Sequence, residues 1–288
     1  MAYELKIEPV TENESAASEP NPATSRLRLG ALTARLLDGA REAHPELHLD
    51  EVRVLAPATF ARISFAPGEE LQMVRAPEVC VVPPGQRTYL RVDPGAEAIL
   101  VSLDSLACEE RAIRVHGRPA RVAAPRTASD GKLREALDAI ALDLRHGRAR
   151  DGDEADPLAS ELALHLASAY GTSEAPSSCA GLARPRLERV LALIDERLTE
   201  ALPVSDLAEA VHLSPFHFSR MFRISTGRSP HEWIMLKRMA RAKALLAGTR
   251  MALPEVAKAS GYRTHSHFSG MFHAVVGMTP GQYRARHS

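Results

Sequence analysis

Residues 206–222 read Asp206-Leu-Ala-Glu-Ala-Val-His-Leu-Ser-Pro-Phe-His-Phe-Ser-Arg-Met-Phe222, and residues 255–272 repeat the pattern as Glu255-Val-Ala-Lys-Ala-Ser-Gly-Tyr-Arg-Thr-His-Ser-His-Phe-Ser-Gly-Met-Phe272. The two copies are offset by 49 residues before their central turn and by 50 after it. A glycine and then a Ser-Pro or Thr-Pro pair follow each copy. An internal repeat of this length indicates that one structural unit occurs twice in the chain.

Each copy has the pattern of a helix-turn-helix unit, and we place the units at about 202–227 and 252–277. Ser214-Pro215 predicts a helix start, because serine caps a helix and proline suits its first position. The predicted caps, inward phenylalanines and end glycines are Ser214, Phe218, Phe222 and Gly227 in the first copy, and Thr264, Phe268, Phe272 and Gly277 in the second, where Gly261 makes the turn. A plain helical bundle explains one such copy equally well, but not two copies with matching caps and glycines.

The C-terminal third of the chain, from about Arg184, resembles the DNA-binding domain of AraC/XylS-type transcription regulators, in which a long helix joins two helix-turn-helix units. Residues 229–246 match the connecting helix of that family. The phrases that carry the likeness in the second unit are Gly261-Tyr262, His267-Phe268-Ser269, Met271-Phe272, Gly277-Met278-Thr279-Pro280 and Tyr283-Arg284. The resemblance implies a sequence-specific regulator of transcription that binds double-stranded DNA, with no catalytic centre and no cofactor.

Composition and charge agree with a two-domain chain. The 288 residues, of which 45% are hydrophobic, are enough for two cores. From Arg184 onward, 16 Lys and Arg stand against 8 Asp and Glu, so this part carries a net charge of +8 and the remainder −8. A basic C-terminal domain beside an acidic N-terminal domain suits a polyanionic partner for the former.

We expect a poorly ordered tail over 1–26, a sensor or dimerisation domain over 27–170, a linker over 171–184 and the DNA-binding domain over 185–288. Three scattered cysteines imply neither a disulfide framework nor a zinc cluster. No stretch approaches the ~18 apolar residues of a membrane span. These features predict a cytoplasmic protein without a membrane partner.

The N-terminal half has the texture of a small β-domain. Between 47 and 126, short apolar runs alternate with Pro-Gly turns, which predicts a small antiparallel barrel or sandwich. Pro67-Gly and Pro77-Glu-Val-Cys-Val-Val-Pro-Pro-Gly85 resemble the cupin-like sensor domain often placed ahead of AraC-type domains. Leucines at helical spacing predict a short helix over 27–43. The predicted fold class is therefore α+β, with a small cupin-like β-barrel and flanking helices ahead of an all-α tandem helix-turn-helix domain.

Catalytic cupins usually bind a metal through histidines, and the matching segment 67–75 contains none, so we expect no metal site. Two alternatives remain open: a barrel that binds a small-molecule effector in its mouth, and one that is packed shut. Arg87, Tyr89 and Arg91 alternate along one strand. They are candidate contacts for an anionic ligand or, equally, a solvated strand face.

Residues 130–146 and 157–170 predict two amphipathic helices. These helices either cover the barrel or form a homodimer interface, and we favour the homodimer because the resembling family places dimer contacts there. RNA polymerase is a further candidate partner for a transcription regulator.

In a helix-turn-helix unit, outward residues of the second helix read base edges in the major groove. By the family's motif, the candidate base contacts are Phe216, Ser219 and Arg220 in the first unit, and His265, Ser266 and Ser269 in the second. Arg220 suits a bidentate contact with guanine, while Phe216 either touches thymine methyl groups or packs on the turn. Gly270 stands where the family commonly has arginine, so the second unit is expected to discriminate less strictly.

Basic residues around the two units are candidates for phosphate contacts, which position a protein on DNA without reading its sequence. They are Arg223, Arg228, Lys237, Arg238, Arg241, Arg263 and Arg284. The alternative functions are a non-specific architectural DNA-binding protein and a cupin-type enzyme fused to a DNA-binding domain. The outward Phe216 and Arg220 oppose the first, and the missing histidines oppose the second.

Overall fold

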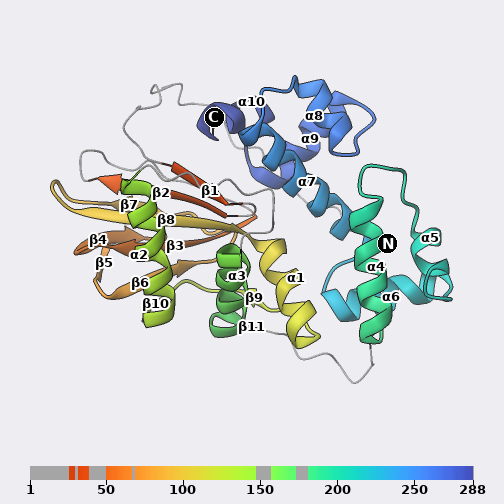
Figure 1. Cartoon of the computed structure of the whole chain (residues 1–288), viewed down its shortest axis with the longest axis horizontal. Helices are drawn as coiled ribbons and strands as arrows, with labels where there is room; N and C mark the ends of the chain where they lie inside the picture. Colours follow the sequence, from red (N-terminus) through yellow and green to blue (C-terminus); the bar gives the residue numbers. More distant parts are fainter. Residues whose placement is uncertain are drawn as a thin grey trace.

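The computed structural model describes residues 26–29, 32–38, 50–66, 69–146, 157–172 and 181–287. All of the expected tail except Arg26 lies outside these residues, as does Cys179. A β-rich N-terminal domain lies beside an all-helical C-terminal domain (Figure 1). The predicted α+β class with two such domains is confirmed.

The N-terminal domain is built on two facing antiparallel sheets. A six-stranded sheet has the order β1-β2-β8-β3-β6-β10, and a three-stranded sheet has the order β5-β4-β7. The short strands β9 and β11 pair with each other. The strands are β1 (Arg26–Leu29), β2 (Leu32–Asp38), β3 (Glu51–Pro57), β4 (Phe60–Ser64), β5 (Gln72–Arg75), β6 (Glu78–Val82), β7 (Tyr89–Arg91), β8 (Glu97–Asp104), β9 (Arg121–Val122), β10 (Arg126–Ser129) and β11 (Gly171–Thr172).

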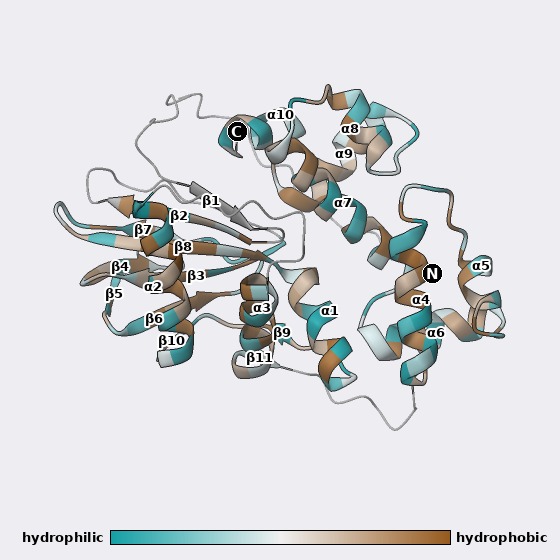
Figure 2. Ribbon diagram, viewed as in Figure 1, coloured by the Kyte–Doolittle hydropathy of each residue, from teal (hydrophilic) through white to brown (hydrophobic). Residues whose placement is uncertain are grey.

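Side chains along the central strands point alternately to the two faces of the six-stranded sheet, and both faces are buried. On β3, Val52 and Val54 pack towards the helices, while Leu55 packs towards the three-stranded sheet. Figure 2 shows hydrophobic residues along the strands β3 and β8. The β11 residues, expected in the linker, instead pair with β9.

The helix expected over 27–43 is wrong, because strands β1 and β2 occupy the described part of this segment. β2 pairs with β8 along its whole length, and Leu32 and Ala34 are buried while Thr33 lies half-exposed between them. The leucines of this segment do fall at helical spacing. Pairing with β8, which lies about 65 residues further along the chain, overrides that local signal.

Two helices cover the outer face of the six-stranded sheet: α2 (Gly131–Arg145) and α3 (Pro157–Ala169) (Figure 1). Their apolar residues Leu133, Leu137, Ile140, Leu144, Leu162 and Leu166 belong to the same core cluster as the sheet. The expectation that these stripes form a homodimer interface is therefore wrong, since the stripes are used inside the chain. The alternative, that the helices cover the β-domain, is what the structure has.

The C-terminal domain contains the two expected helix-turn-helix units, joined by a long helix. Its helices are α4 (Arg184–Glu196), α5 (Val204–Glu209), α6 (Pro215–Thr226), α7 (Pro230–Gly248), α8 (Leu253–Ala259), α9 (His265–Val276) and α10 (Pro280–His287). Ser214 and Thr264 cap α6 and α9, and glycines with left-handed backbone end both helices. In each unit the two phenylalanine rings lie with centroids 5.6 Å apart and are fully buried. The expected caps, phenylalanines and glycines are thus confirmed.

Each turn has one residue with left-handed backbone, and the two units place different residues there. His212 has φ of 56° in the first turn, and Gly261 has φ of 85° in the second. A side chain in this region costs about 1–2 kcal/mol relative to ordinary backbone. We therefore expect His212→Gly to raise the free energy of unfolding by about 1 kcal/mol in urea denaturation.

The matched control is Gly261→Ala. Its added Cβ would lie 2.9 Å from the carbonyl oxygen of Leu198 and 2.8 Å from Nε of Arg238, so this variant should lose stability. A destabilised His212→Gly protein would show that the histidine side chain outweighs its backbone strain.

Candidate nucleic-acid interface

The outward face of α6 is open to solvent and carries the candidate base contacts of the first unit. Phe216 is 83% exposed, which is unusual for so large an apolar side chain. Arg220 and Arg223 are also exposed, and neither side chain forms a hydrogen bond or ion pair with a residue that the structure describes. Phe216 is therefore not packed on the turn, and both guanidinium groups are free to reach a ligand.

Ser219 is placed less favourably for base contact. It is half-exposed, and its hydroxyl donates a hydrogen bond to the carbonyl oxygen of Pro215 at 2.8 Å. Only its oxygen lone pairs remain available to a base.

The second unit presents a smaller set of functional groups along α9. His265 and Ser266 are exposed, and Nε2 of His265 lies 3.3 Å from the hydroxyl of Ser269. Gly270 is exposed, and a Cβ built there would meet no protein atom within 4 Å. Packing within the described part of the protein thus does not require a glycine here. At this position α9 presents no side chain to solvent.

The candidate phosphate contacts divide into three groups. The side chains of Arg223 and Arg263 are exposed and make no hydrogen bond or ion pair with the described residues. Arg238, Arg241 and Arg284 donate hydrogen bonds to backbone carbonyl oxygens of Leu198 and Glu200, of Ala259, and of Met251, respectively. The internal bonds of this second group hold neighbouring segments of the domain together. The third group, Arg228 and Lys237, is held by the N-terminal domain.

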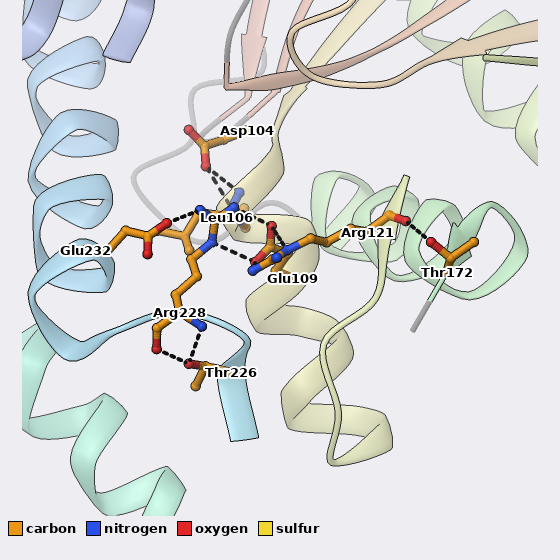
Figure 3. A network of polar contacts seen from close by, with 9 residues as sticks. Asp104, Leu106, Glu109, Arg121, Thr172, Thr226, Arg228 and Glu232 are labelled. Carbon is orange, nitrogen blue, oxygen red and sulfur yellow. Dashed lines mark hydrogen bonds and ion pairs between the residues drawn. The ribbon is translucent and has the colours of Figure 1, made fainter. Parts of the chain in front are cut away.

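The helix α1 (Ser105–His116) supplies the carboxylates that hold this third group, and Figure 3 shows the contact of Glu109 with Arg228. Glu109 accepts hydrogen bonds from Nη2 and Nε of Arg228 at 2.8 and 3.0 Å. Burial opposes the charged form of Arg228, but its bonds with Glu109 and Glu232 outweigh burial and raise its pKa. Glu110 accepts a hydrogen bond from Nζ of Lys237 at 2.8 Å. Burial favours the neutral form of Glu110, but Lys237 and Arg114 together outweigh that effect and lower the pKa of the carboxyl group.

A third cation of the C-terminal domain, on α7, is more deeply buried. Nζ of Lys243 lies 2.7 Å from Asp50, 2.9 Å from Asp104 and 3.5 Å from Glu51. Burial acts to lower the pKa of Lys243, and the three carboxylates raise it well above its ordinary value. Sequence reasoning missed these acidic residues. The only signal for them was the opposite net charge of the two domains, which also suits the domains to each other.

The candidate ligand contacts of the N-terminal domain lie on an open strand face. Arg87 and Arg91 are exposed, Tyr89 is half-exposed, and Leu90 points into the core between them. A cavity of about 340 Å³ lies elsewhere, at the domain boundary, and is lined by Val52, Pro83, Cys108, Glu109, Arg121 and Arg228 among others. None of the three candidate ligand contacts lines it.

Two further observations limit the chemistry of the described part of the chain. It contains no group of three or more His, Cys, Asp and Glu side chains that would hold a metal ion. Across the same described ranges, no helix is long and apolar enough to cross a membrane. Cys80 and Cys108 are buried, and burial raises the pKa of both thiols.

Comparison with known proteins supports this geometry. Residues 207–286 match the family model described as a helix-turn-helix domain. The chain is 30% identical over 99 residues to the regulatory protein PocR of Salmonella typhimurium, which covers 34% of this chain and 33% of PocR. It is 31% identical over 125 residues to the transcriptional activator NphR of a Rhodococcus species, covering 43% of this chain and 37% of NphR. The chain therefore spans about a third of the length of these curated relatives.

The solved structure of ToxT from Vibrio cholerae O395 resembles the whole chain, with a TM-score of 0.50 and 12% identity over 90% of this chain and 98% of ToxT. At that identity the likeness concerns the fold alone. Two capped recognition helices joined by a long helix define a tandem helix-turn-helix domain. The matching family model and the relatives agree with a helix-turn-helix domain in this part of the chain.

Proposed function

We propose that this protein is a sequence-specific DNA-binding regulator of transcription. The observation that carries the proposal is the open face of α6, where Phe216 and Arg220 project into solvent without a partner among the described residues. An apolar ring and a guanidinium group in this position match thymine methyl groups and guanine edges in the major groove. Arg223 and Arg263 are suited to the flanking phosphates.

Selection from a random duplex library, followed by competition with bulk DNA at fixed salt, tests the proposal. A sequence-specific protein enriches one motif and keeps it when unrelated duplex is in excess, typically with 10³-fold or greater preference. An architectural DNA-binding protein would enrich no motif, and that outcome would remove sequence specificity from the proposal.

The N-terminal domain is proposed as the part that senses an effector. The boundary cavity supports this role, because its walls come from both domains and include buried apolar and charged side chains. A ligand bound there would interact differently with docked and undocked domains, which is the requirement for regulation.

The second unit is expected to bind DNA more permissively than the first, because Gly270 leaves its helix without a central side chain. Gly270→Arg should raise the affinity for random-sequence duplex several-fold, since it adds a cation beside the phosphates. It should also raise the free energy of unfolding by up to about 1 kcal/mol, since glycine is a poor helix former.

Gly270→Ala is the matched control, because it improves the helix without adding charge. It should share the gain in stability and show no gain in affinity. Well-folded Gly270→Arg protein that binds more weakly would show that α9 docks too closely for a long side chain, and the proposed hierarchy of the two units would be wrong.

A further inference from the structure

The two domains are joined by ion pairs along α7 and the residues just before it. Three cations of the C-terminal domain are contacted by acidic side chains of the N-terminal domain: Arg228, just before α7, and Lys237 and Lys243 on α7. The acidic partners are Asp50, Glu51, Asp104, Glu109 and Glu110. Arg121 and Arg114 of the N-terminal domain also bond Glu109 and Glu110, so the five carboxylates and these two arginines carry a net charge of −3, which matches the three cations of the C-terminal domain.

The contact at Glu109 has the geometry of an arginine–anion pair. Two nitrogens of Arg228 donate to the two carboxylate oxygens, and Nη2 of Arg121 adds a third donor at 3.1 Å (Figure 3). The Glu109 side chain is only 3% exposed. A guanidinium group binds a phosphate through the same pair of parallel hydrogen bonds. While Glu109 holds Arg228, that pair of donors is unavailable to DNA.

At Glu110 the cation held by α1 is a lysine, Lys237. Nζ of Lys237 is shared between Glu110 at 2.8 Å and Asp195 of α4 at 2.7 Å. Asp195 belongs to the DNA-binding domain itself, whereas Glu110 belongs to the N-terminal domain. Undocking of α1 would therefore leave Lys237 with one carboxylate partner in place of two.

The apolar contacts of α1 keep these carboxylates in position. Leu106 and Ile113 belong to the core cluster of the first helix-turn-helix unit, together with Phe218 and Trp233. Cys108, on the same helix, belongs to the core of the N-terminal domain. One helix is thus anchored in both cores, and Glu109 and Glu110 lie between its anchor points.

From this arrangement we infer that Glu109 and Glu110 compete with DNA phosphates for Arg228 and Lys237, so that the docked N-terminal domain lowers the affinity of the protein for DNA. The inference rests on the proposed DNA-binding function and adds its regulation. The base-reading face of α6 stays open in the docked state, so the restraint is electrostatic. Release of α1 would return two phosphate contacts to the DNA-binding domain.

The test compares the full-length protein with the double variant Glu109→Gln/Glu110→Gln, using a fluorescent random-sequence duplex at several salt concentrations. Glutamine keeps the shape of each side chain and removes its charge. The variant should bind about tenfold more tightly at low salt, and the slope of log affinity against log salt should steepen by up to about two, since each phosphate contributes about 0.9. Glu110→Gln alone, at the more accessible site, should steepen the slope by about one and serves if the double variant folds poorly.

The control for net charge is Glu69→Gln/Glu70→Gln, which removes the same charge from exposed positions away from α7. It should change the slope much less. In a mutant cycle, Lys237→Gln should cancel the gain that Glu110→Gln produces. The inferred competition would be wrong if wild type and the α1 variants had equal salt slopes, or if the Glu69/Glu70 control gained as much affinity as they do. Neither result would contradict DNA binding itself. Loss of duplex binding by wild type and all variants would overturn the proposed function as well.

Discussion

Lys243→Met is expected to lower the free energy of unfolding by about 3–5 kcal/mol, the range for breaking a buried ion pair from one side. The Lys243 side chain is only 5% exposed, and its ammonium group is close to Asp50, Glu51 and Asp104. Methionine matches the length of the lysine stem but leaves three carboxylates close together without their cation. Chemical denaturation of the full-length protein at neutral pH measures the loss.

The direction of its pH dependence follows from Asp50. Burial raises the pKa of Asp50, and Lys243 opposes that rise, so removing the lysine should raise the pKa further. A carboxyl group whose folded pKa is raised takes up a proton on folding, so it costs stability above that pKa and costs less as the pH falls. The deficit of Lys243→Met should therefore shrink as the pH is lowered from neutral.

The exposed residue Lys258 offers a matched control, and Lys258→Met should change stability by less than about 0.5 kcal/mol. In the Lys243→Met background, Asp50→Asn should recover part of the loss, because it removes one uncompensated charge. A Lys243→Met protein within about 1 kcal/mol of wild type would show that the carboxylates are hydrated or neutral in the folded protein.

Arg220→Ala is expected to weaken binding to the selected site by about 5- to 150-fold, which corresponds to the 1–3 kcal/mol of a bidentate base contact. Binding to random duplex should fall only a few-fold, because that binding depends on phosphates. The reason is geometric: Arg220 lies on the outward face of α6, is exposed, and bonds to no described residue. The same fluorescence titration, run with both duplexes at one salt concentration, gives the two numbers.

Arg223→Ala supplies the comparison from one turn further along the same helix. As a phosphate contact it should weaken both duplexes alike and lower the salt slope by about one. If Arg220→Ala also weakens both duplexes equally, Arg220 contacts the backbone, and base reading by the first unit must come from Phe216 and its neighbours.

The C-terminal domain was predictable because its determinants are local. A cap such as Ser214, a terminal glycine such as Gly227 and an inward pair such as Phe218 and Phe222 act within one or two helical turns. The repeat supplied a second, independent copy of each signal. The candidate base contacts followed from the same register, because the inward face of a helix determines its outward face.

The parts that sequence reasoning missed depend on partners far away in the chain. The 27–43 segment became strands because β2 pairs with β8, and its helical spacing of leucines carried no information about that neighbour. Glu109 and Arg228 are 119 residues apart, and Asp50 and Lys243 are 193 residues apart. A charge in a sequence does not show whether its partner is water, DNA or another domain, so these contacts required the fold.

The packing of α1 also limits how the domains of this protein can be exchanged with those of other proteins. The boundary read from the sequence falls before Arg184, yet the hydrophobic core of the first helix-turn-helix unit takes in Leu106 and Ile113 from well ahead of it. In a chimera that joins residues 181–287 to a foreign N-terminal domain, the core of the first helix-turn-helix unit would be incomplete unless the foreign domain supplies two equivalent apolar side chains. The two domains are thus separable in the sequence, but their cores share α1 in the folded protein. An exchange of domains at the linker therefore requires a foreign N-terminal domain with an equivalent helix.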